Sequence, residues 1–186
     1  MTGGGVPRRF RAEPRERLLA RFEAALAARD GATAAECVHE LWMRGEIGLN
    51  VERALGRLWA AAAASVPEWL PMRHVEWLPS AYEIAARCVA ERRGRSNIYL
   101  VLLDYRDSGG DPYGLYVGMS EYSPAERFDQ HKAGIRASGS VLRRGLEVLT
   151  GPVLHLQRIA RDEAERIESE LAEALRAAGL RVRGGH

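Results

Sequence analysis

The spacing of hydrophobic residues changes once along this chain, at residues 94–97 ("GRSN"), and that change most constrains the fold. From residue 13 to 93, apolar side chains recur every three or four positions, which is the period of an amphipathic helix. The segments at 98–105 ("IYLVLLDY") and 113–119 ("YGLYVGM") are short, apolar and rich in branched and aromatic residues, which is typical of buried strands. We therefore predict an all-helical part followed by a part of the α/β (α+β) class.

The chain accordingly divides into three predicted parts. Residues 1–12 are rich in glycine and arginine and lack the apolar segment of a secretory signal, so we expect a flexible basic tail. Residues 13–94 are expected to form a helical domain and residues 95–186 the α+β domain. A chain of 186 residues is long enough for two small domains that each have a core.

Apolar periodicity and capping signals together predict four helices in the helical domain. Thr33 with Glu36 and Ser80 with Glu83 have the spacing of capping boxes, and Asn50 is a suitable N-cap for a helix between them. Three prolines interrupt the pattern between the third and fourth predicted helices. The fourth helix is expected to run to the start of "GRSN".

The composition argues against several classes of protein. With 46% hydrophobic and 28% charged residues, the chain has the balance of a folded globular protein. Its apolar runs are too short to cross a bilayer, so we expect a cytoplasmic protein that does not bind membranes. Cys37 and Cys88 stand in no CxxC pair, which predicts two buried thiols rather than a zinc site or a disulfide. The net charge of +2 is too small for a strongly basic nucleic-acid-binding protein, although arginine outnumbers the single lysine, Lys132.

The α+β half carries signals for a small sheet. A turn-forming segment at 106–112 separates the two predicted strands, which predicts a β-hairpin. Ser123 followed by proline and then Glu126 predicts the start of a helix, and "PVLHLQRI" at 152–159 predicts a third strand. A long amphipathic helix is predicted over 161–179, and the "LRVRGG" tail can add an edge strand. We expect a mainly antiparallel three-stranded sheet flanked by helices.

Residues suited to catalysis gather in "GLYVGMSEYSPAERFDQH" at 114–131. This stretch places a tyrosine at the end of a predicted strand, and an arginine and a histidine four residues apart on one face of the next helix. With "NIY" at 97–99 and "YVG" at 116–118, the order of strand, strand, helix, strand and acid-bearing helix resembles the GIY-YIG nuclease superfamily. The resemblance covers residues 97 to about 185.

The resemblance implies a phosphodiesterase site. Tyr116 stands at the position of a tyrosine that activates water, and Tyr99 on the neighbouring strand is expected to share or relay the proton. A phenol with an ordinary pKa of about 10 is a poor base, so this role needs a cationic neighbour or a metal-bound water. Arg127 is the expected cation, and Arg127 and His131 together are expected to contact the phosphate and the leaving group.

The resemblance also implies a metal ligand on the last helix. Glu168 borders the apolar stripe centred on Leu171, and Ala164, Glu168 and Leu171 match the family pattern around its metal-binding glutamate. A lone carboxylate completed by waters and substrate phosphate is a common Mg²⁺ site, and Mn²⁺ is the expected substitute. Glu165 and Glu163 are the alternative ligands.

Three positions depart from the family pattern. Asn97 replaces the first glycine, Met119 follows YVG where many members carry lysine, and no residue of the tail matches a late asparagine. We expect Lys132 to take over the phosphate contact of the missing lysine and Arg183 to occupy the role of the asparagine.

These expectations define a divalent-metal-dependent endonuclease that acts on DNA, with RNA as an open alternative. Arg143 and Arg144 are expected to contact backbone phosphates, although a solvated surface explains them equally well. A homodimer would suit cleavage of both strands. For the helical domain three alternatives stay open: it clamps DNA, it mediates dimerisation, or it binds a protein partner. The rival functions are a GIY-YIG-like fold without catalysis that binds nucleic acid or protein, and a helical scaffold that binds a partner.

Overall fold

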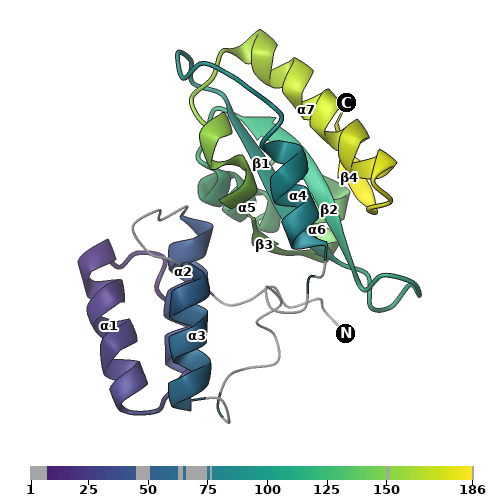
Figure 1. Ribbon diagram of the computed structural model, residues 1–186. Coiled ribbons are helices and arrows are strands. Elements are labelled where there is room, and N and C mark those ends of the chain that lie inside the picture. The colour runs from purple at the N-terminus through teal and green to yellow at the C-terminus, as the bar shows by residue number, and fades with distance from the viewer. Residues whose placement is uncertain are drawn as a thin grey trace. The chain divides into compact units, whose positions relative to one another are not determined.

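The chain folds into two compact units, Val6–His74 and Val75–His186. The computed structural model describes residues 8–44, 51–62, 65, 75, 77–149 and 151–185, and Figure 1 shows the elements along the chain. Among these residues no helix combines the length and the hydropathy needed to cross a membrane.

Three helices build the N-terminal unit. Helices α1 (Arg15–Ala27), α2 (Gly31–Met43) and α3 (Val51–Ala62) pack against one another, as their periodicity predicts. The core they share is lined by Leu18, Phe22, Cys37, Val38, Leu41 and Leu58.

The start of α2 differs from the prediction. Asp30 is the N-cap, because its carboxylate accepts a hydrogen bond of 3.0 Å from the Thr33 N–H. Thr33 therefore lies inside the first turn, and the predicted capping box of Thr33 with Glu36 is wrong. Asn50, the predicted N-cap of α3, lies outside the described residues.

The second half of the predicted basic tail is packed against helices. Phe10 is buried, and Arg8 forms a 2.9 Å ion pair with Glu40 of α2. Arg44 donates hydrogen bonds to the carbonyls of Phe10 and Glu13. An aromatic anchor and these paired charges order residues 8–12, whereas residues 1–7 lie outside the described ranges.

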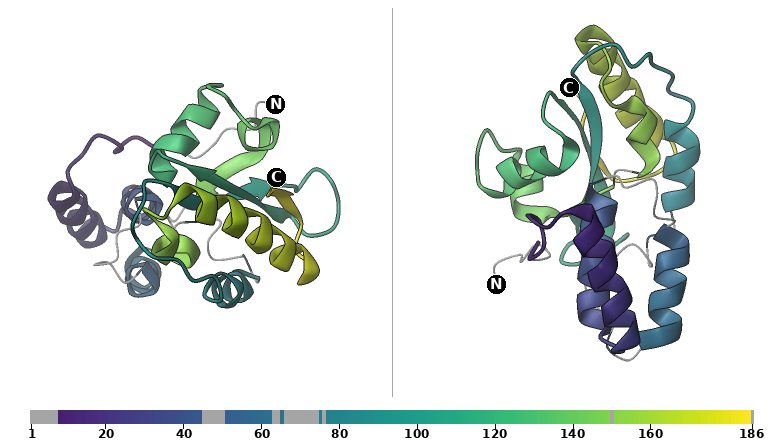
Figure 2. Two further views of the ribbon diagram at one scale, coloured as in Figure 1. Left: turned by 90° about the horizontal axis from the view of Figure 1, so that it is seen from above. Right: turned by 90° about the vertical axis from the view of Figure 1, so that its left-hand side faces the viewer.

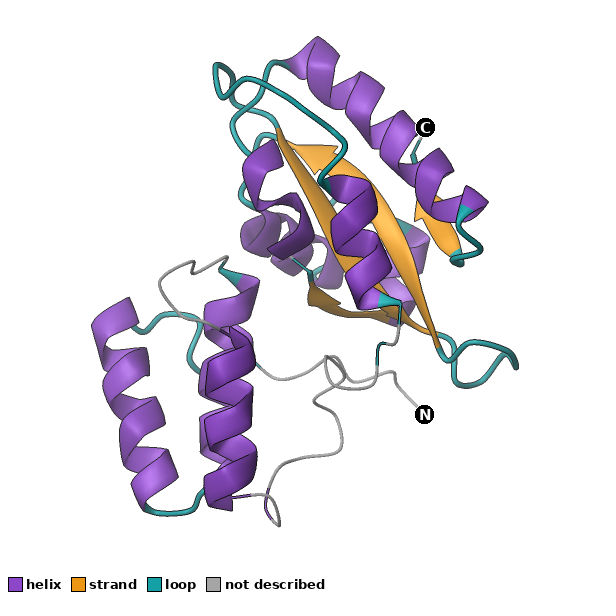
Figure 3. Cartoon of the chain, viewed as in Figure 1, coloured by secondary structure: helices purple, strands orange, loops and turns teal. Residues whose placement is uncertain are grey.

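The C-terminal unit contains a four-stranded mixed sheet, drawn in orange in Figure 3, with the order β3-β1-β2-β4. The predicted hairpin is confirmed: β1 (Asn97–Asp104) pairs antiparallel with β2 (Tyr113–Ser120). The strand β3 (Gly145–Val148) pairs antiparallel with the other edge of β1. The "LRVRGG" tail adds β4 (Val182–Gly184), which runs parallel to β2 and makes the sheet mixed.

The predicted third strand at 152–159 is wrong. Most of it is the 3₁₀ helix η3 (Gly151–Leu156), and only Ile159 pairs, as an isolated bridge with Ser96. Pro152 has no N–H to donate to a sheet, and periodicity alone cannot distinguish a short apolar strand from a short buried helix. The edge position is taken by β3 instead.

Helices cover both faces of this sheet (Figure 2). Helices α5 (Pro124–Lys132) and α6 (Gly139–Arg144) pack on one face, and η3 and α7 (Arg161–Ala177) pack on the other. The capping box that was predicted at the start of α5 is confirmed, because Ser123 and Glu126 exchange both of its hydrogen bonds. Gly179 follows α7 with a φ of 87°, as its predicted role as helix terminator requires.

Helix α4 (Leu78–Ala85) belongs to the C-terminal unit, although we expected it in the helical domain. It packs on α7 and η3, and His155 Nε2 of η3 lies 3.1 Å from the carbonyl oxygens of both Ala85 and Cys88. The boundary between the units therefore falls 20 residues before the predicted one at 94. Because α4 begins at Leu78, the predicted capping box at Ser80 is wrong, and Cys88 beyond its end is half-buried.

Candidate functional site

The two tyrosines of the predicted site lie side by side on one face of the sheet. Tyr99 is opposite Gly118 and Tyr116 is opposite Val101 in the β1–β2 register, so both side chains lie on the face that α5 covers. Their ring centroids are 6.0 Å apart. Alternation along two antiparallel strands thus brings together residues that are 17 positions apart in sequence.

His131 connects this pair to the loop after α5. The backbone N–H of Ser138 donates to His131 Nδ1 at 2.9 Å, and His131 Nε2 lies 2.9 Å from the Tyr99 hydroxyl. Since Nδ1 accepts a hydrogen bond, the proton of the neutral ring is on Nε2, which donates to the Tyr99 oxygen. Burial and the nearby Arg127 charge lower the pKa of His131 to about 4, so the ring is neutral at pH 7.

This geometry changes the role expected for His131. Its side chain is buried and both ring nitrogens are engaged within the fold, so it has no free donor for a phosphate or a leaving group. What it does is hold the Tyr99 hydroxyl in place.

The two phenols differ in accessibility. Tyr99 is 2% exposed, whereas Tyr116 is half-buried and is the one that a substrate can reach. Burial raises the pKa of Tyr99 and is also the largest influence on Tyr116, whose pKa is raised as well. The hydroxyls of Tyr99 and Ser138 lower the pKa of Tyr116 by hydrogen bonding, but they do not offset its burial.

Arg127 does not make Tyr116 a base. Its charge lowers the pKa of Tyr116, yet that pKa stays above its ordinary value, so the phenol is neutral at pH 7. The guanidinium donates hydrogen bonds to the Ile135 and Arg136 carbonyls at 3.2 and 2.8 Å. Arg127 therefore fixes the α5–α6 loop and contributes a positive field to the site.

Among the three candidate acids of α7, Glu168 is the one that acts on Tyr116. Its carboxylate is close enough for its charge to raise the pKa of that phenol. Glu165 is exposed and hydrogen-bonded to Arg161 at 3.0 Å. The hydrogen bond with Glu170 is the main cause of the raised pKa of Arg166, and the charge of Glu163 adds a smaller contribution. Of these three acids, Glu168 is therefore the one whose charge influences the predicted catalytic tyrosine.

The donor set suits a hard cation with waters. Within the described ranges, no group of three His, Cys, Asp or Glu side chains is arranged to hold a metal. A single carboxylate fits Mg²⁺, which keeps most of its waters and takes one or two carboxylates together with substrate phosphate. It does not fit zinc, which prefers several nitrogen or sulfur ligands.

Gly118 provides the space in which the phenols pack. A Cβ atom at this position would lie 2.6 Å from Tyr99 Cζ and 2.7 Å from Tyr116 Cε1. We expect Gly118→Ala to displace the two rings and to lower the free energy of unfolding by about 1–3 kcal/mol. Urea unfolding measures the effect, with Gly139→Ala as control because a Cβ there meets only the flexible Arg143 side chain, at 3.3 Å. Equal stability of the two variants would contradict the packing role.

Asn97, which departs from the family pattern, and Lys132, the expected substitute for the missing lysine, both have structural roles. Asn97 is buried; its amide group donates to the Tyr122 carbonyl at 3.0 Å and its side-chain oxygen accepts from the Arg158 N–H at 3.0 Å, so it ties the start of β1 to two neighbouring segments. Lys132 donates to the carbonyls of Leu142 and Gly145, and burial lowers the pKa of its amine. Lys132 therefore holds the end of α6 and does not present its charge as the expected phosphate contact.

The three predicted nucleic-acid-binding arginines lie together. Arg143, Arg144 and Arg183 line one polar cavity of about 460 Å³. We did not predict the other lining residues of this cavity, or Ser138 beside Tyr116, from the sequence. For Arg181 a signal was available: it alternates with Arg183 in the tail, and residues two positions apart share one side of a strand. These four further lining residues are Tyr105, Ser108, Ser140 and Arg181.

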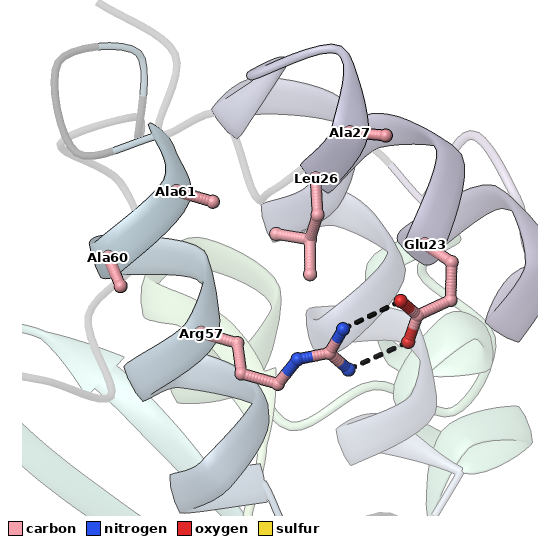
Figure 4. Close-up of a pocket in the computed structure, with 6 residues that line it drawn as sticks. All are labelled: Glu23, Leu26, Ala27, Arg57, Ala60 and Ala61. Carbon is pink, nitrogen blue, oxygen red and sulfur yellow. Dashed lines mark hydrogen bonds and ion pairs between the residues drawn. The ribbon is translucent and has the colours of Figure 1, made fainter.

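The N-terminal unit has a separate groove between α1 and α3, drawn in Figure 4. Small and aliphatic side chains form most of it, including Leu26, Ala27 and Ala60. An ion pair of 2.6 Å between Arg57 and Glu23 spans it, as the dashed lines in Figure 4 mark. Both charges of that pair are satisfied by each other, so the groove offers no reactive group.

Tyr116, Tyr99 and His131 thus lie together, from β2, β1 and α5. The charge of Glu168 on α7 raises the pKa of Tyr116, and the polar arginine-lined cavity lies on the same face of the sheet as the tyrosines. Comparisons of the chain with protein-family models, with curated proteins and with solved structures gave no match.

Proposed function

We propose that this chain is a divalent-metal-dependent endonuclease that hydrolyses phosphodiester bonds in DNA. One observation carries the proposal: Tyr116 is a half-buried phenol beside a buried Tyr99–His131 hydrogen-bonded pair, and the charge of Glu168 raises its pKa. These residues belong to separate strands and helices, so the fold has to bring several elements together to form this arrangement. A buried, polar and carefully tethered cluster of this kind is more typical of a reactive site than of a packing core.

Tyr116 is proposed to orient the attacking water. The oxygen of this neutral phenol accepts hydrogen bonds from Tyr99 and Ser138, so its O–H is the group that donates to the water and aligns the water oxygen with a phosphate. Tyr99 and Ser138 restrict the orientation of its hydroxyl, and His131 in turn holds Tyr99. The side chains therefore supply alignment before any substrate arrives.

Glu168 is proposed to hold Mg²⁺ through its carboxylate. The ion supplies, when bound, positive charge for the phosphate and a lower pKa for a coordinated water. Arg127 is proposed to add a positive field, and Arg183, opposite Tyr116 in the β2–β4 register, is proposed to contact the phosphate.

The test is cleavage of labelled duplex, branched and single-stranded DNA with Mg²⁺ or Mn²⁺, and with EDTA in place of metal. We expect metal-dependent cutting of at least one substrate, and its loss by Glu168→Ala, because the metal then has no protein ligand. Glu165→Ala is the matched control, since it removes an exposed carboxylate from the same helix. Full activity of metal-replete Glu168→Ala would exclude the proposed site.

A second function, a nucleic-acid-binding or protein-interaction module without catalysis, is favoured by one specific observation. Among the main influences on the pKa of Tyr116 there is one carboxylate, Glu168, and that pKa is raised rather than lowered. DNA binding without cleavage of any substrate, in either metal, would select this function.

A further inference from the structure

The arginine cavity, defined as the space lined by Tyr105, Arg143, Arg144, Arg181 and Arg183 with two serines, has a rigid construction. The Tyr105 ring is buried, and guanidinium carbons lie over it at 4.6 Å for Arg144 and 4.2 Å for Arg181. Arg183 Nε lies 3.5 Å from the Tyr105 hydroxyl. The Tyr105 ring therefore restrains Arg144 of α6 and also Arg181 and Arg183 of the C-terminal tail.

The positive charge of the cavity is largely uncompensated. Arg144 is paired with Asp107 of the hairpin turn. In the part of the chain that the structure describes, Arg143, Arg181 and Arg183 have no carboxylate partner. Arg161 and Arg166 on α7, by contrast, each pair with a glutamate one turn away. Converging guanidinium groups without acids form a site for an anion, and their planar donors match phosphate.

The cavity lies next to the proposed catalytic site. Arg183, which lines the cavity, is opposite Tyr116 in the sheet, and a Cβ atom added to Gly114, two residues earlier on the same face of β2, would lie 2.8 Å from Tyr105 Cε2. Two residues of strand span about 7 Å. That length corresponds to about two rises of 3.4 Å per nucleotide, measured along the axis of duplex DNA.

We propose that the arginine cavity binds a backbone phosphate of the nucleic-acid strand, one or two nucleotides from the phosphate at Tyr116. The inference rests on the proposed function, because the strand held at Tyr116 is taken as the occupant. Its volume of about 460 Å³ accommodates a phosphate with its sugar, and its polar lining suits a polyanion rather than an apolar ligand. The cavity thereby sets the register of the strand relative to the water-orienting tyrosine.

The binding test uses a fluorescein-labelled 20-nucleotide strand and its duplex, titrated by anisotropy in EDTA so that no cutting occurs. We expect Arg143→Ala with Arg181→Ala to weaken binding by about 10- to 100-fold and to reduce the salt slope by about one, since the cavity is proposed to hold one phosphate and each lost phosphate contact lowers the slope by about one. The matched control is Arg161→Ala with Arg166→Ala, which removes the same charge from ion pairs on α7. The control is expected to bind within about twofold of the parent chain.

Three results would overturn the inference: equal weakening in both double variants, an unchanged salt slope, or competition by adenosine monophosphate as effective as that by the unlabelled strand. The last result would make the cavity a mononucleotide site. The single variant Arg143→Ala is the control for a double variant that fails to fold, because the Arg143 side chain is exposed and has no partner among the described residues.

The spacing is tested separately with strands that carry one neutral methylphosphonate at successive positions. Neutralisation one or two nucleotides from the cut bond should weaken binding of the parent chain but not of the double variant. If the parent chain cleaves DNA but the cavity variants bind it as tightly as the parent does, the phosphate-binding inference is refuted and the nuclease proposal is not. If binding depends on the cavity arginines but no substrate is cleaved, the nuclease proposal is refuted and the binding inference is not.

Discussion

Tyr116→Phe is expected to reduce DNA cleavage by about 10²–10⁴-fold, the range of a positioned proton-transfer or water-orienting group. The substitution removes one hydroxyl and keeps the ring that packs over Gly118. Tyr99 cannot replace the lost hydroxyl, because it is 2% exposed and is bonded to His131. Metal-replete single-turnover cleavage measures the rate, and anisotropy in EDTA should show unchanged DNA binding.

Tyr122→Phe is the matched control, because that phenol is 55% exposed at the end of β2 and lies outside the cluster. It should cut at the rate of the parent chain. Cleavage by Tyr116→Phe at the parent rate, with the fold intact by circular dichroism, would remove Tyr116 from the proposed mechanism.

Glu40→Ala is expected to lower the free energy of unfolding by about 3–5 kcal/mol, the cost of breaking a buried ion pair by removing one partner. The Glu40 carboxylate is 2% exposed and accepts hydrogen bonds from Arg8 at 2.9 Å and Arg44 at 2.7 Å. Without it, two guanidinium groups remain in a largely buried position. Because Arg44 also binds the carbonyls of Phe10 and Glu13, the N-terminal segment should detach as well.

Urea unfolding of the full chain measures this loss, with Glu23→Ala as control. Glu23 also pairs with an arginine, but the side chains of that pair are 57% and 48% exposed, so its removal should change stability little. Similar losses in the two variants would contradict a special role for the buried pair.

The same carboxylate should make stability depend on pH. Burial would raise the pKa of Glu40, but the hydrogen bonds from Arg8 and Arg44 outweigh it and the pKa is lowered. The unfolded chain then binds the proton more readily, so this stabilisation is present above the ordinary glutamate pKa of about 4.3 and is lost as pH falls below it. Glu40→Gln should remove that component of the acid transition.

Local signals predicted the elements that local interactions determine. The hairpin follows from two apolar runs around a glycine-rich turn, and α5 follows from Ser123 and Glu126, whose reciprocal hydrogen bonds need no tertiary contact. The "YVG" tyrosine and the "NIY" tyrosine came together for the same reason, because strand alternation and a hairpin register are local properties.

Tertiary packing decided the assignments that were wrong. The run at 152–159 is as apolar as a strand, but Pro152 removes a donor and Gly145–Val148 occupies the edge of β1 instead. Helix α4 has the same period as the helices before it, and only its contacts with α7 and η3 place it in the other unit. A period shows that an element has a buried face but does not show what covers that face.

The chemical roles of the site residues divide in the same way. The sequence by itself determined which residue types stand near one another: tyrosines on paired strands, Arg127 and His131 on one helix face, and Glu168 at the border of an apolar stripe. Only the tertiary structure decided that His131 is buried and neutral, that Lys132 holds backbone carbonyls, and that Arg181 joins the predicted arginines in one cavity. Burial and long-range hydrogen bonding set protonation and accessibility, and both depend on neighbours from distant parts of the chain.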